Sequence, residues 1–349
     1  MICVPHLSLT VPSVCVCVCV FVVYEDDFIR VVDSTETETD GAFAGSDMGN
    51  SVGTGSDSAC MDDVNAGEPG GVTPPAVSVS VRRRLEFKES PQYSQSEIQL
   101  APVVGHYGVY QGQRFQQYRA DHSRLLFSAH RVIAGECKSF LSSRSDHGPD
   151  GDGDGLPRAV EVVVLGAGGC ALPCHLIDAL GSVPPCARVV VDAVDTESVV
   201  LLAARAHFGA GEYEDNGDLA LHVGDGLAFL DNRSMMTANQ GNLKQGEDGS
   251  VGYDIIVLDV CCIDESGVIS TSGEEGTGEL HLALKQWSRA IARAGCRGGG
   301  VYINAWGTGW IEEAVRVFDA SGLFTAVRVT EVAISEGGHR NAVLATSIK

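Results

Sequence analysis

A tight glycine turn directly after an apolar segment is the feature that most constrains this sequence. Residues 161–181 read EVVVLGAGGCALPCHLIDALG, in which a valine-rich run leads into Gly166, Gly168 and Gly169 and an apolar helix pattern follows. Short valine-rich runs predict buried strands, and glycine permits positive φ angles and close approach by another group. The segment therefore predicts a strand, a turn and a helix, with the turn either purely structural or open to a ligand.

The same strand-then-helix pattern repeats from Ala159 to the end of the sequence. Strand-like segments are expected at 160–166, 188–195, 219–225, 253–260 and 299–307. Helical segments between strands predict a mostly parallel sheet covered on both faces. The last two segments, 324–334 and 341–349, are separated only by SEGGHR and must pair antiparallel. We therefore expect a Rossmann-like, seven-stranded α/β sheet with a terminal antiparallel hairpin, the architecture of class I methyltransferases.

Composition divides the chain into four parts. Residues 33–81 contain nine acidic side chains and no lysine or arginine, and they are rich in glycine and serine, which is typical of disorder. We expect a low-complexity, disordered N-terminal segment at residues 1–80 and a small α+β subdomain at residues 81–143. An acidic glycine-rich linker at residues 144–158 would lead into the cofactor-binding methyltransferase domain at residues 159–349. In the subdomain, strands are expected near 84–87 and 108–110, and a helix near 123–140.

Charge and cysteine content restrict the partners and the compartment. The net charge of −22 comes without a basic stripe, so we do not expect a nucleic-acid partner. Most of the twelve cysteines occur singly in apolar patterns, which favours a reducing, cytoplasmic environment. The apolar run VPSVCVCVCVFVV at 11–23 is short for a membrane-spanning helix, and no membrane association is expected. A translated TG repeat, a targeting segment and a real strand remain alternatives for this run.

Aspartates end three successive strand segments after the glycine turn. Asp195, Asp225 and Asp259 follow the second, third and fourth strands. The carboxyl ends of parallel strands form the ligand edge of an open α/β sheet, so these acids and the turn are expected to meet there. Asp195 and Asp225 also precede helices and could instead be helix caps. An acid at the end of each of three successive strands favours a nucleotide site over three separate helix caps.

Two nucleotide cofactors fit this arrangement. GAGGCA, residues 166–171, matches the G-x-G-x-x-A pattern of NAD sites. The acid after the third strand and the terminal hairpin favour S-adenosylmethionine instead, and this cofactor is the one we expect.

The motifs together resemble one branch of this fold. VVVLGAGGCALPCHL, VDAVD, VGDGLAFL and YDIIVLDV resemble the spermidine-synthase-like class I methyltransferases. The segments RRRLEFKESPQYSQSEIQL and DHSRLLFSAHRVIAGECKSF are similar to the C-terminal domain of the methyltransferase-like 13 family, which modifies translation elongation factor 1-alpha. The resemblance covers residues 81–349 and implies a cytoplasmic N-methyltransferase that acts on a lysine or the N-terminus of a protein.

The resemblance also assigns roles to residues of the site. The methionine end of S-adenosylmethionine would be held by Gly166, Ala167, Gly168 and Gly169. Asp195 would bind the ribose, and Asp225 with Gly226 the adenine. Asp259 would act at the reacting amine, with Asp264 as a second catalytic acid.

Departures from the family keep other functions open. Glu265 stands where the family has proline after the second acid, and RLLFSAHRV lacks the Tyr-Gln pair of aminopropyltransferases. Two alternative functions therefore remain. The first is polyamine synthesis by aminopropyl transfer, which these departures disfavour. The second is a catalytically silent scaffold, which the altered loop DVCCIDE keeps open. Preference for decarboxylated S-adenosylmethionine would indicate aminopropyl transfer, and absence of cofactor binding would indicate the scaffold.

Remaining chemical residues have simpler interpretations. Cys170 and Cys174 lack a second pair at zinc spacing, and we expect packed thiols and no metal. His130 is expected to be a core histidine of an apolar helix. Trp306 and Trp310 are expected either to wall a substrate cleft or to cover the sheet.

Overall fold

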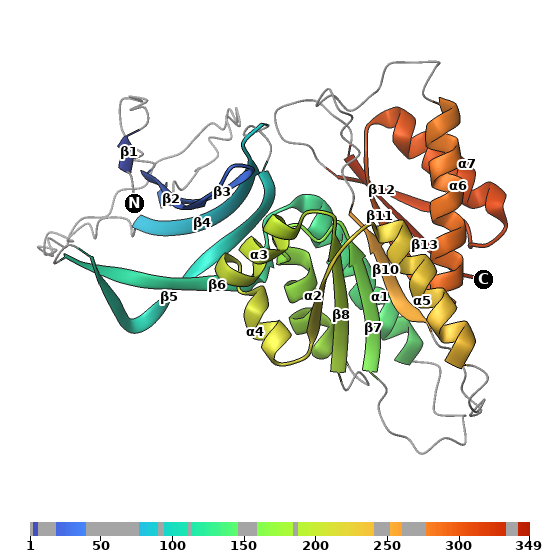
Figure 1. The fold of residues 1–349 in the computed structure, drawn as a ribbon, viewed down its shortest axis with the longest axis horizontal. Helices are drawn as coiled ribbons and strands as arrows, with labels where there is room; N and C mark the ends of the chain where they lie inside the picture. The colour runs from blue at the N-terminus through green and yellow to red at the C-terminus, as the bar shows by residue number, and fades with distance from the viewer. Residues whose placement is uncertain are drawn as a thin grey trace, which may run out of the picture.

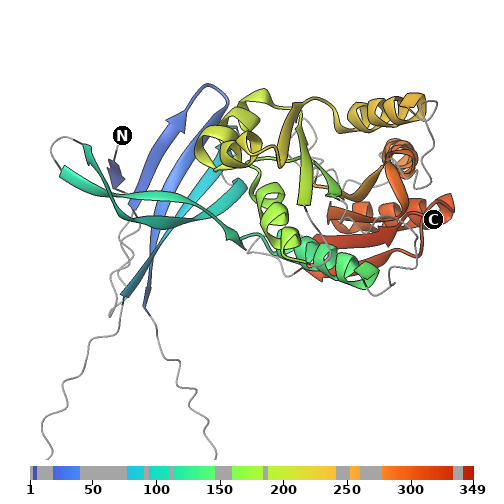
Figure 2. The ribbon, with the colours of Figure 1, turned by 90° about the horizontal axis from the view of Figure 1, so that it is seen from below.

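The computed structural model of the chain contains two β-sheets side by side (Figure 1). It describes residues 3–5, 19–39, 77–89, 94–110, 113–145, 159–183, 188–240, 252–259, 277–332 and 341–349. The N-terminal sheet is antiparallel, and the C-terminal sheet is mostly parallel with helices on both faces. Figure 2 shows the two sheets from below, with the N-terminal sheet at the left.

The C-terminal sheet has seven strands in the order β12-β13-β11-β10-β7-β8-β9. Its strands are β7 (Ala159–Leu165), β8 (Arg188–Asp195), β9 (Leu219–Val223), β10 (Tyr253–Leu258), β11 (Gly295–Trp306), β12 (Arg328–Val332) and β13 (Asn341–Ser347). Every residue of β10 is buried, as is the second half of β7, because both strands lie in the middle of the sheet with helices above and below. The continuous apolar runs in the sequence follow from this position.

The terminal hairpin is present, and the expected fold class is confirmed. β13 pairs antiparallel with both β11 and β12, while the adjacent strands β11, β10, β7, β8 and β9 pair parallel with one another. The chain between β12 and β13 is too short for a crossover helix, so the last strand must reverse direction. The turn itself, residues 335–340, lies outside the described residues.

Seven helices are described: α1 (Ser128–Ser145), α2 (Ala171–Gly181), α3 (Ser198–His207), α4 (Ala210–Asp215), α5 (Gly226–Gln240), α6 (Thr277–Ala294) and α7 (Thr308–Ser321). One hydrophobic core lies between the sheet and α1 to α4, and a second between the sheet and α5 to α7. None of these helices, in the part of the chain that the structure covers, has both the length and the apolar character that crossing a bilayer requires.

The N-terminal sheet has six strands in sequence order, each antiparallel to its neighbour. They are β1 (Cys3–Pro5), β2 (Cys19–Glu25), β3 (Ile29–Thr39), β4 (Val77–Phe87), β5 (Ser94–Tyr110) and β6 (Gln113–Leu125). Ile29, Val31, Leu85 and Ile98 are at most 1% exposed, and they form a third core together with residues of α3. This core attaches the N-terminal sheet to the C-terminal one.

Two expectations about the N-terminal region differ from the structure. Residues 24–39, expected to be disordered, and residues 19–23, for which a real strand was one alternative, form β2 and β3. The side chains of β3 alternate between two faces, and Ile29 and Val31 on one face lie in the third core. β6 extends to Leu125, so the helix begins five residues later than expected. The region 40–76 lies outside the described residues.

Helix α1 was expected in the small N-terminal subdomain, but it packs on the seven-stranded sheet. Ile133, Cys137 and Leu141 are buried in the core between α1 and the seven-stranded sheet, together with Tyr302 of β11 and Val343 of β13. The small N-terminal unit is therefore a sheet without a helix of its own among the described residues. Most of the acidic linker, residues 146–158, lies outside the described residues.

His122 of β6 is a buried polar residue where the two sheets meet. Its side chain is 6% exposed, its ring lies edge-on to Tyr213, and its backbone carbonyl accepts a hydrogen bond from His175 Nδ1 at 2.6 Å. Neither ring nitrogen of His122 has a hydrogen-bond partner among the described residues. Burial lowers the pKa of His122 to about 4, so the folded protein holds this ring neutral at pH 7.

The position of His122 predicts an acid-sensitive contribution to stability. The unfolded chain binds a proton below about pH 6.5 whereas the folded chain does so only near pH 4, so stability must fall as the pH falls through this window. We expect this histidine to account for about 2 kcal/mol of the decrease in unfolding free energy between pH 7 and pH 5. Urea unfolding of the full chain and of His122→Phe at both pH values measures it. The decrease should shrink in His122→Phe and persist in the control His106→Phe, which alters an exposed histidine; equal decreases in all three proteins would contradict the prediction.

Candidate functional site

The predicted site residues that the structure describes come together at one edge of the seven-stranded sheet. Gly166, Asp195 and Asp259 lie at the carboxyl ends of β7, β8 and β10, and Asp225 lies two residues beyond β9. The four strands are parallel neighbours, so their ends share one edge. The Asp259 N–H donates to the carbonyl of Leu165 at 2.8 Å, which joins two of these strand ends directly. The expected convergence of the turn and the acids is therefore found.

Positive φ angles shape the turn after β7. Gly166 has φ 82° and Gly168 has φ 51°, both in the left-handed region that favours glycine, and Cys170 adopts φ 59° despite its side chain. The N–H groups of Gly166 and Ala167 both donate to the carbonyl of Val194, at 2.9 and 3.0 Å. The turn is thereby fixed against the end of β8, and these two N–H groups are already used within the protein.

The carboxylate of Asp195 also holds this turn in place. Its Oδ2 accepts the Gly168 N–H at 2.9 Å, and its Oδ1 accepts the Glu197 N–H at 3.0 Å, just before α3. The cap-like role considered from the sequence is thus present. A carboxylate has about four acceptor positions, so both oxygens can still accept hydrogen bonds from a ligand.

Gly169 is used for packing between the two sheets. Its N–H donates to Ser96 Oγ of β5 at 2.6 Å, and a Cβ at this position would lie 2.8 Å from the Cβ of Ser96 and 3.2 Å from Phe208. Only glycine allows this close approach. Ser96 was not singled out from the sequence, although it lies in the upstream motif that carries the family resemblance.

Asp225 and Gly226 lie at the start of α5. The Oδ1 of Asp225 accepts the Ala228 N–H at 2.8 Å, so this acid caps the helix, and its side chain is exposed. A Cβ on Gly226 would lie 3.1 Å from Trp287 and 3.4 Å from Leu165, so the absence of a side chain lets the start of α5 pack closely against both residues. Asp225 keeps a second oxygen for a ligand.

Asp259 forms a buried network with two residues that the sequence did not identify as functional. Its Oδ2 lies 2.7 Å from His130 Nε2 on α1, and its Oδ1 accepts the Asn304 Nδ2 at 2.7 Å from β11. The side chains of His130 and Asp259 are only 9% and 14% exposed. The network thus places Asp259 between α1 and β11, which are far apart in the sequence.

The surroundings of Asp259 keep it ionised. Burial by itself would raise the pKa of Asp259, but the charge of His130 and the hydrogen bonds from His130 and Asn304 outweigh burial and hold the pKa below its usual value. The carboxylate is therefore negative at neutral pH. With one acceptor position used on each oxygen, it can accept further hydrogen bonds from an amine.

The remaining candidates divide into packed residues and an undescribed loop. Asp264 and the rest of DVCCIDE after Asp259 lie outside the described residues. Cys170 and Cys174 are buried free thiols, and burial raises the pKa of each, so both are protonated packing residues. Trp310 packs against the core under α5 to α7, whereas Trp306 ends β11 at the site edge.

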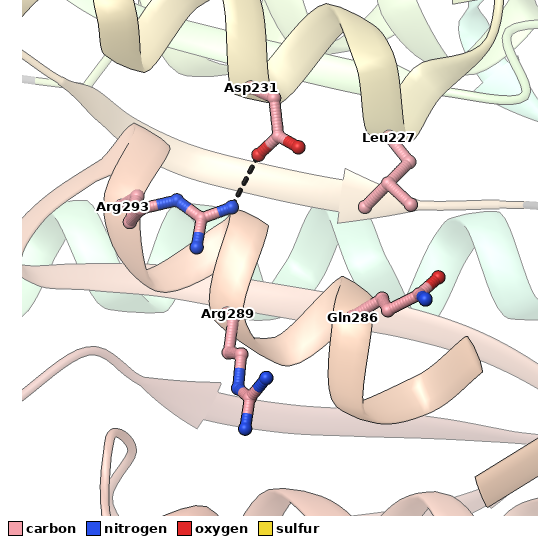
Figure 3. A pocket seen from close by; sticks show the side chains of 5 residues that line it. All are labelled: Leu227, Asp231, Gln286, Arg289 and Arg293. Atoms are coloured by element: carbon pink, nitrogen blue, oxygen red, sulfur yellow. Dashed lines mark hydrogen bonds and ion pairs between the residues drawn. The ribbon is translucent and has the colours of Figure 1, made fainter. Parts of the chain in front are cut away.

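The surface hollow between α5 and α6 does not include the predicted site residues. It has a volume of about 390 Å³ and is lined by Leu227, Asp231, Gln286, Arg289 and Arg293. Figure 3 shows Arg293 paired with Asp231 across this hollow, with Arg289 on the same helix as Arg293. The site edge, rather than this hollow, carries the candidate chemistry.

The buried pair of His130 and Asp259 predicts an uneven effect of two histidine substitutions. His130→Ala leaves the buried carboxylate of Asp259 without one of its two hydrogen-bond partners, and we expect a loss of about 3 kcal/mol of unfolding free energy at pH 7. The matched control is His222→Ala, which breaks a His–Asp pair of similar length, 2.8 Å, whose histidine is 37% exposed. This control should lose at most about 1 kcal/mol. Chemical denaturation of both variants decides the matter, and equal losses would show that Asp259 does not depend on His130.

Sequence comparison assigns no family. No family model and no curated protein matches the chain. The solved structures that resemble it include a probable spermidine synthase from Corynebacterium glutamicum, with a TM-score of 0.43 at 14% identity over 72% of this chain and 77% of that one.

Two further solved structures are similar at the same low level. The spermidine synthase from Thermotoga maritima has a TM-score of 0.38 at 15% identity, over 73% of this chain and 76% of that one. The N-methyltransferase NodS from Bradyrhizobium japonicum has a TM-score of 0.37 at 10% identity, over 62% of this chain and 95% of that one. Because these similarities are low, the function has to be inferred from the residues of the site itself.

Proposed function

We propose that the chain is an S-adenosylmethionine-dependent methyltransferase that methylates an amine of a protein. The observation that carries this proposal is the ionised, buried Asp259, held by His130 and Asn304 at the same sheet edge as the glycine turn. An acid in this position can bind an amine beside a nucleotide site. The protein acceptor follows from the family resemblance, which names translation elongation factor 1-alpha as the first acceptor to test and the cytoplasm as the compartment.

The residues at the edge suit S-adenosylmethionine. The N–H groups of Gly166, Ala167 and Gly168 are bonded within the protein, so the turn offers space for the methionine end of the cofactor rather than hydrogen bonds. Asp195 can accept the two ribose hydroxyls with its remaining acceptor positions. Asp225, whose second oxygen is free of the helix cap, can accept the adenine amino group beside Gly226.

The reaction requires an amine with a free lone pair, held in line with the methyl group. S-adenosylmethionine supplies an electrophilic methyl group when it is bound. Asp259 accepts hydrogen bonds from the amine, orients it, and offsets the positive charge that develops on its nitrogen. It can also take the released proton, directly or through water. Asp264 is kept as a second proposed acid on the basis of the resemblance.

His130 and Asn304 are positioning residues in this proposal. Each donates or shares one hydrogen bond with a different oxygen of Asp259, which fixes the plane of the carboxylate. The same two contacts lower its pKa, so that it stays ionised in a closed site. A fixed, charged acid needs little rearrangement when the amine binds.

Binding of the cofactor to the full chain is the first test. Calorimetric titration should show S-adenosylmethionine binding in preference to its decarboxylated form and to NAD. Asp195→Asn should weaken that binding at least about tenfold, because the ribose loses charged acceptors. The control Asp215→Ala, which alters an acid that is 79% exposed, should bind like the unchanged chain.

The other outcomes of this titration identify the alternatives. Preference for the decarboxylated form would replace methyl transfer by aminopropyl transfer. NAD binding would exclude both reactions. Binding of none of the three would leave the scaffold as the function.

Substitution of Asp259 tests the chemical step. Asp259→Asn keeps the size of the side chain and removes its charge, so we expect methyl transfer to elongation factor 1-alpha to fall at least about 100-fold. Transfer of a labelled methyl group, measured together with cofactor binding, separates the two effects. Cofactor affinity should stay within about threefold of the unchanged chain. Undiminished transfer in this variant would remove Asp259 from the mechanism.

A further inference from the structure

Three buried polar atoms near the site lack hydrogen-bond partners among the described residues. They are Asn304 Oδ1 and Trp306 Nε1 of β11 and Asn341 Oδ1 of β13. The side chains of Asn304 and Asn341 are only 6% and 8% exposed. Buried polar groups in folded proteins are nearly always hydrogen-bonded, so three unsatisfied atoms in one region indicate groups that a ligand completes.

Strand geometry places the three side chains on one face of the sheet. Asn304 and Trp306 are two residues apart in one strand, so they point to the same side. Trp306 is the direct antiparallel partner of Asn341, which puts these two side chains next to each other on that side. Since Asn304 bonds Asp259, this is also the side of the proposed amine site.

The unpartnered atoms have complementary chemistry. Trp306 Nε1 can only donate a hydrogen bond, and Asn341 Oδ1 can only accept one. A peptide unit presents one carbonyl acceptor and one N–H donor, so it can satisfy both atoms at once. Asn304 Oδ1, beside Asp259, is a further acceptor for an amine. A polyamine, which has no carbonyl, would leave the tryptophan unsatisfied.

We propose that Trp306 and Asn341 bind the backbone of the acceptor, so that the methylated amine is that of a lysine side chain within a peptide. This inference rests on the proposed function. Trp306 lies about 7 Å along the strand from Asn304, which is comparable to the length of the four-carbon lysine stem. With the amine at Asp259 and Asn304, the lysine backbone reaches Trp306 and Asn341. An N-terminal amine lies too close to its own first carbonyl to span this separation.

Binding can be tested without any methyl transfer. The chain has three tryptophans, and the indole N–H signal of Trp306 can be assigned from the spectra of Trp287→Phe and Trp310→Phe by elimination. Adding N-acetyl-lysine N-methylamide to the 15N-labelled chain should shift the Trp306 signal. Butylamine, which carries the amine and stem alone, should leave this signal in place. Trp310→Phe serves as the matched control because its ring packs on the opposite face of the sheet.

The variant arm measures affinity. Asn341→Ala should weaken binding of N-acetyl-lysine N-methylamide about tenfold, because it removes the acceptor for the peptide N–H. Trp310→Phe should change this affinity less than twofold. If methyl transfer is found, Asn341→Ala should raise the KM of a lysine peptide with blocked ends and change kcat little.

The outcomes separate this inference from the proposed function. A Trp306 shift with the lysine compound supports peptide binding even if no methyl transfer is found. No shift, or an equal shift with butylamine, overturns the inference while leaving methyl transfer to other amines intact. A larger shift with glycylglycine N-methylamide, which presents an N-terminal amine, would overturn the assignment to lysine.

Discussion

The architecture of the site depends on the hydrogen bonds of Asp259. Its side chain joins His130 of α1 to Asn304 of β11, and its N–H binds the carbonyl of Leu165 at the end of β7. One residue thus fixes the relative positions of a helix and three adjacent strands. Because a buried carboxylate is costly without partners, these contacts must form together or not at all. The contacts of the Asp259 carboxylate therefore account both for the rigidity of the sheet edge and for its negative charge.

A second acid organises the neighbouring half of the edge in a different way. Asp195 accepts two backbone N–H groups, one from the glycine turn and one from the start of α3, and its side chain is only partly buried. It closes the turn while keeping acceptor positions for a ligand. In the proposed function, the half-open part of this edge binds the nucleotide and the closed part binds the amine. The unsatisfied atoms of Trp306 and Asn341 extend the closed part toward β13.

Much of the fold and part of the site could be predicted from the sequence because they depend on local patterns. The valine-rich run before Gly166, and the acids Asp195, Asp225 and Asp259 after their strands, are local signals, and the parallel topology brings their ends together. His130 could not be identified in this way. On its helix it occupies an apolar face, where a histidine has the same periodicity whether it packs or pairs with a carboxylate 129 residues away. Asn304 is similarly hidden within the apolar strand VYINAW.

The sequence by itself determined the seven-stranded sheet, its terminal hairpin and the edge at which the acids meet, because residue periodicity and short connections fix local geometry. Only the tertiary structure decided what each acid does there. It made Asp225 a helix cap, Asp195 the closure of the turn and Asp259 the centre of a buried network. It also turned a region expected to be disordered into β2 and β3, because their apolar side chains gain a core only when β4, β5 and α3 are present. These outcomes depend on contacts between residues distant in the chain, which no local pattern specifies.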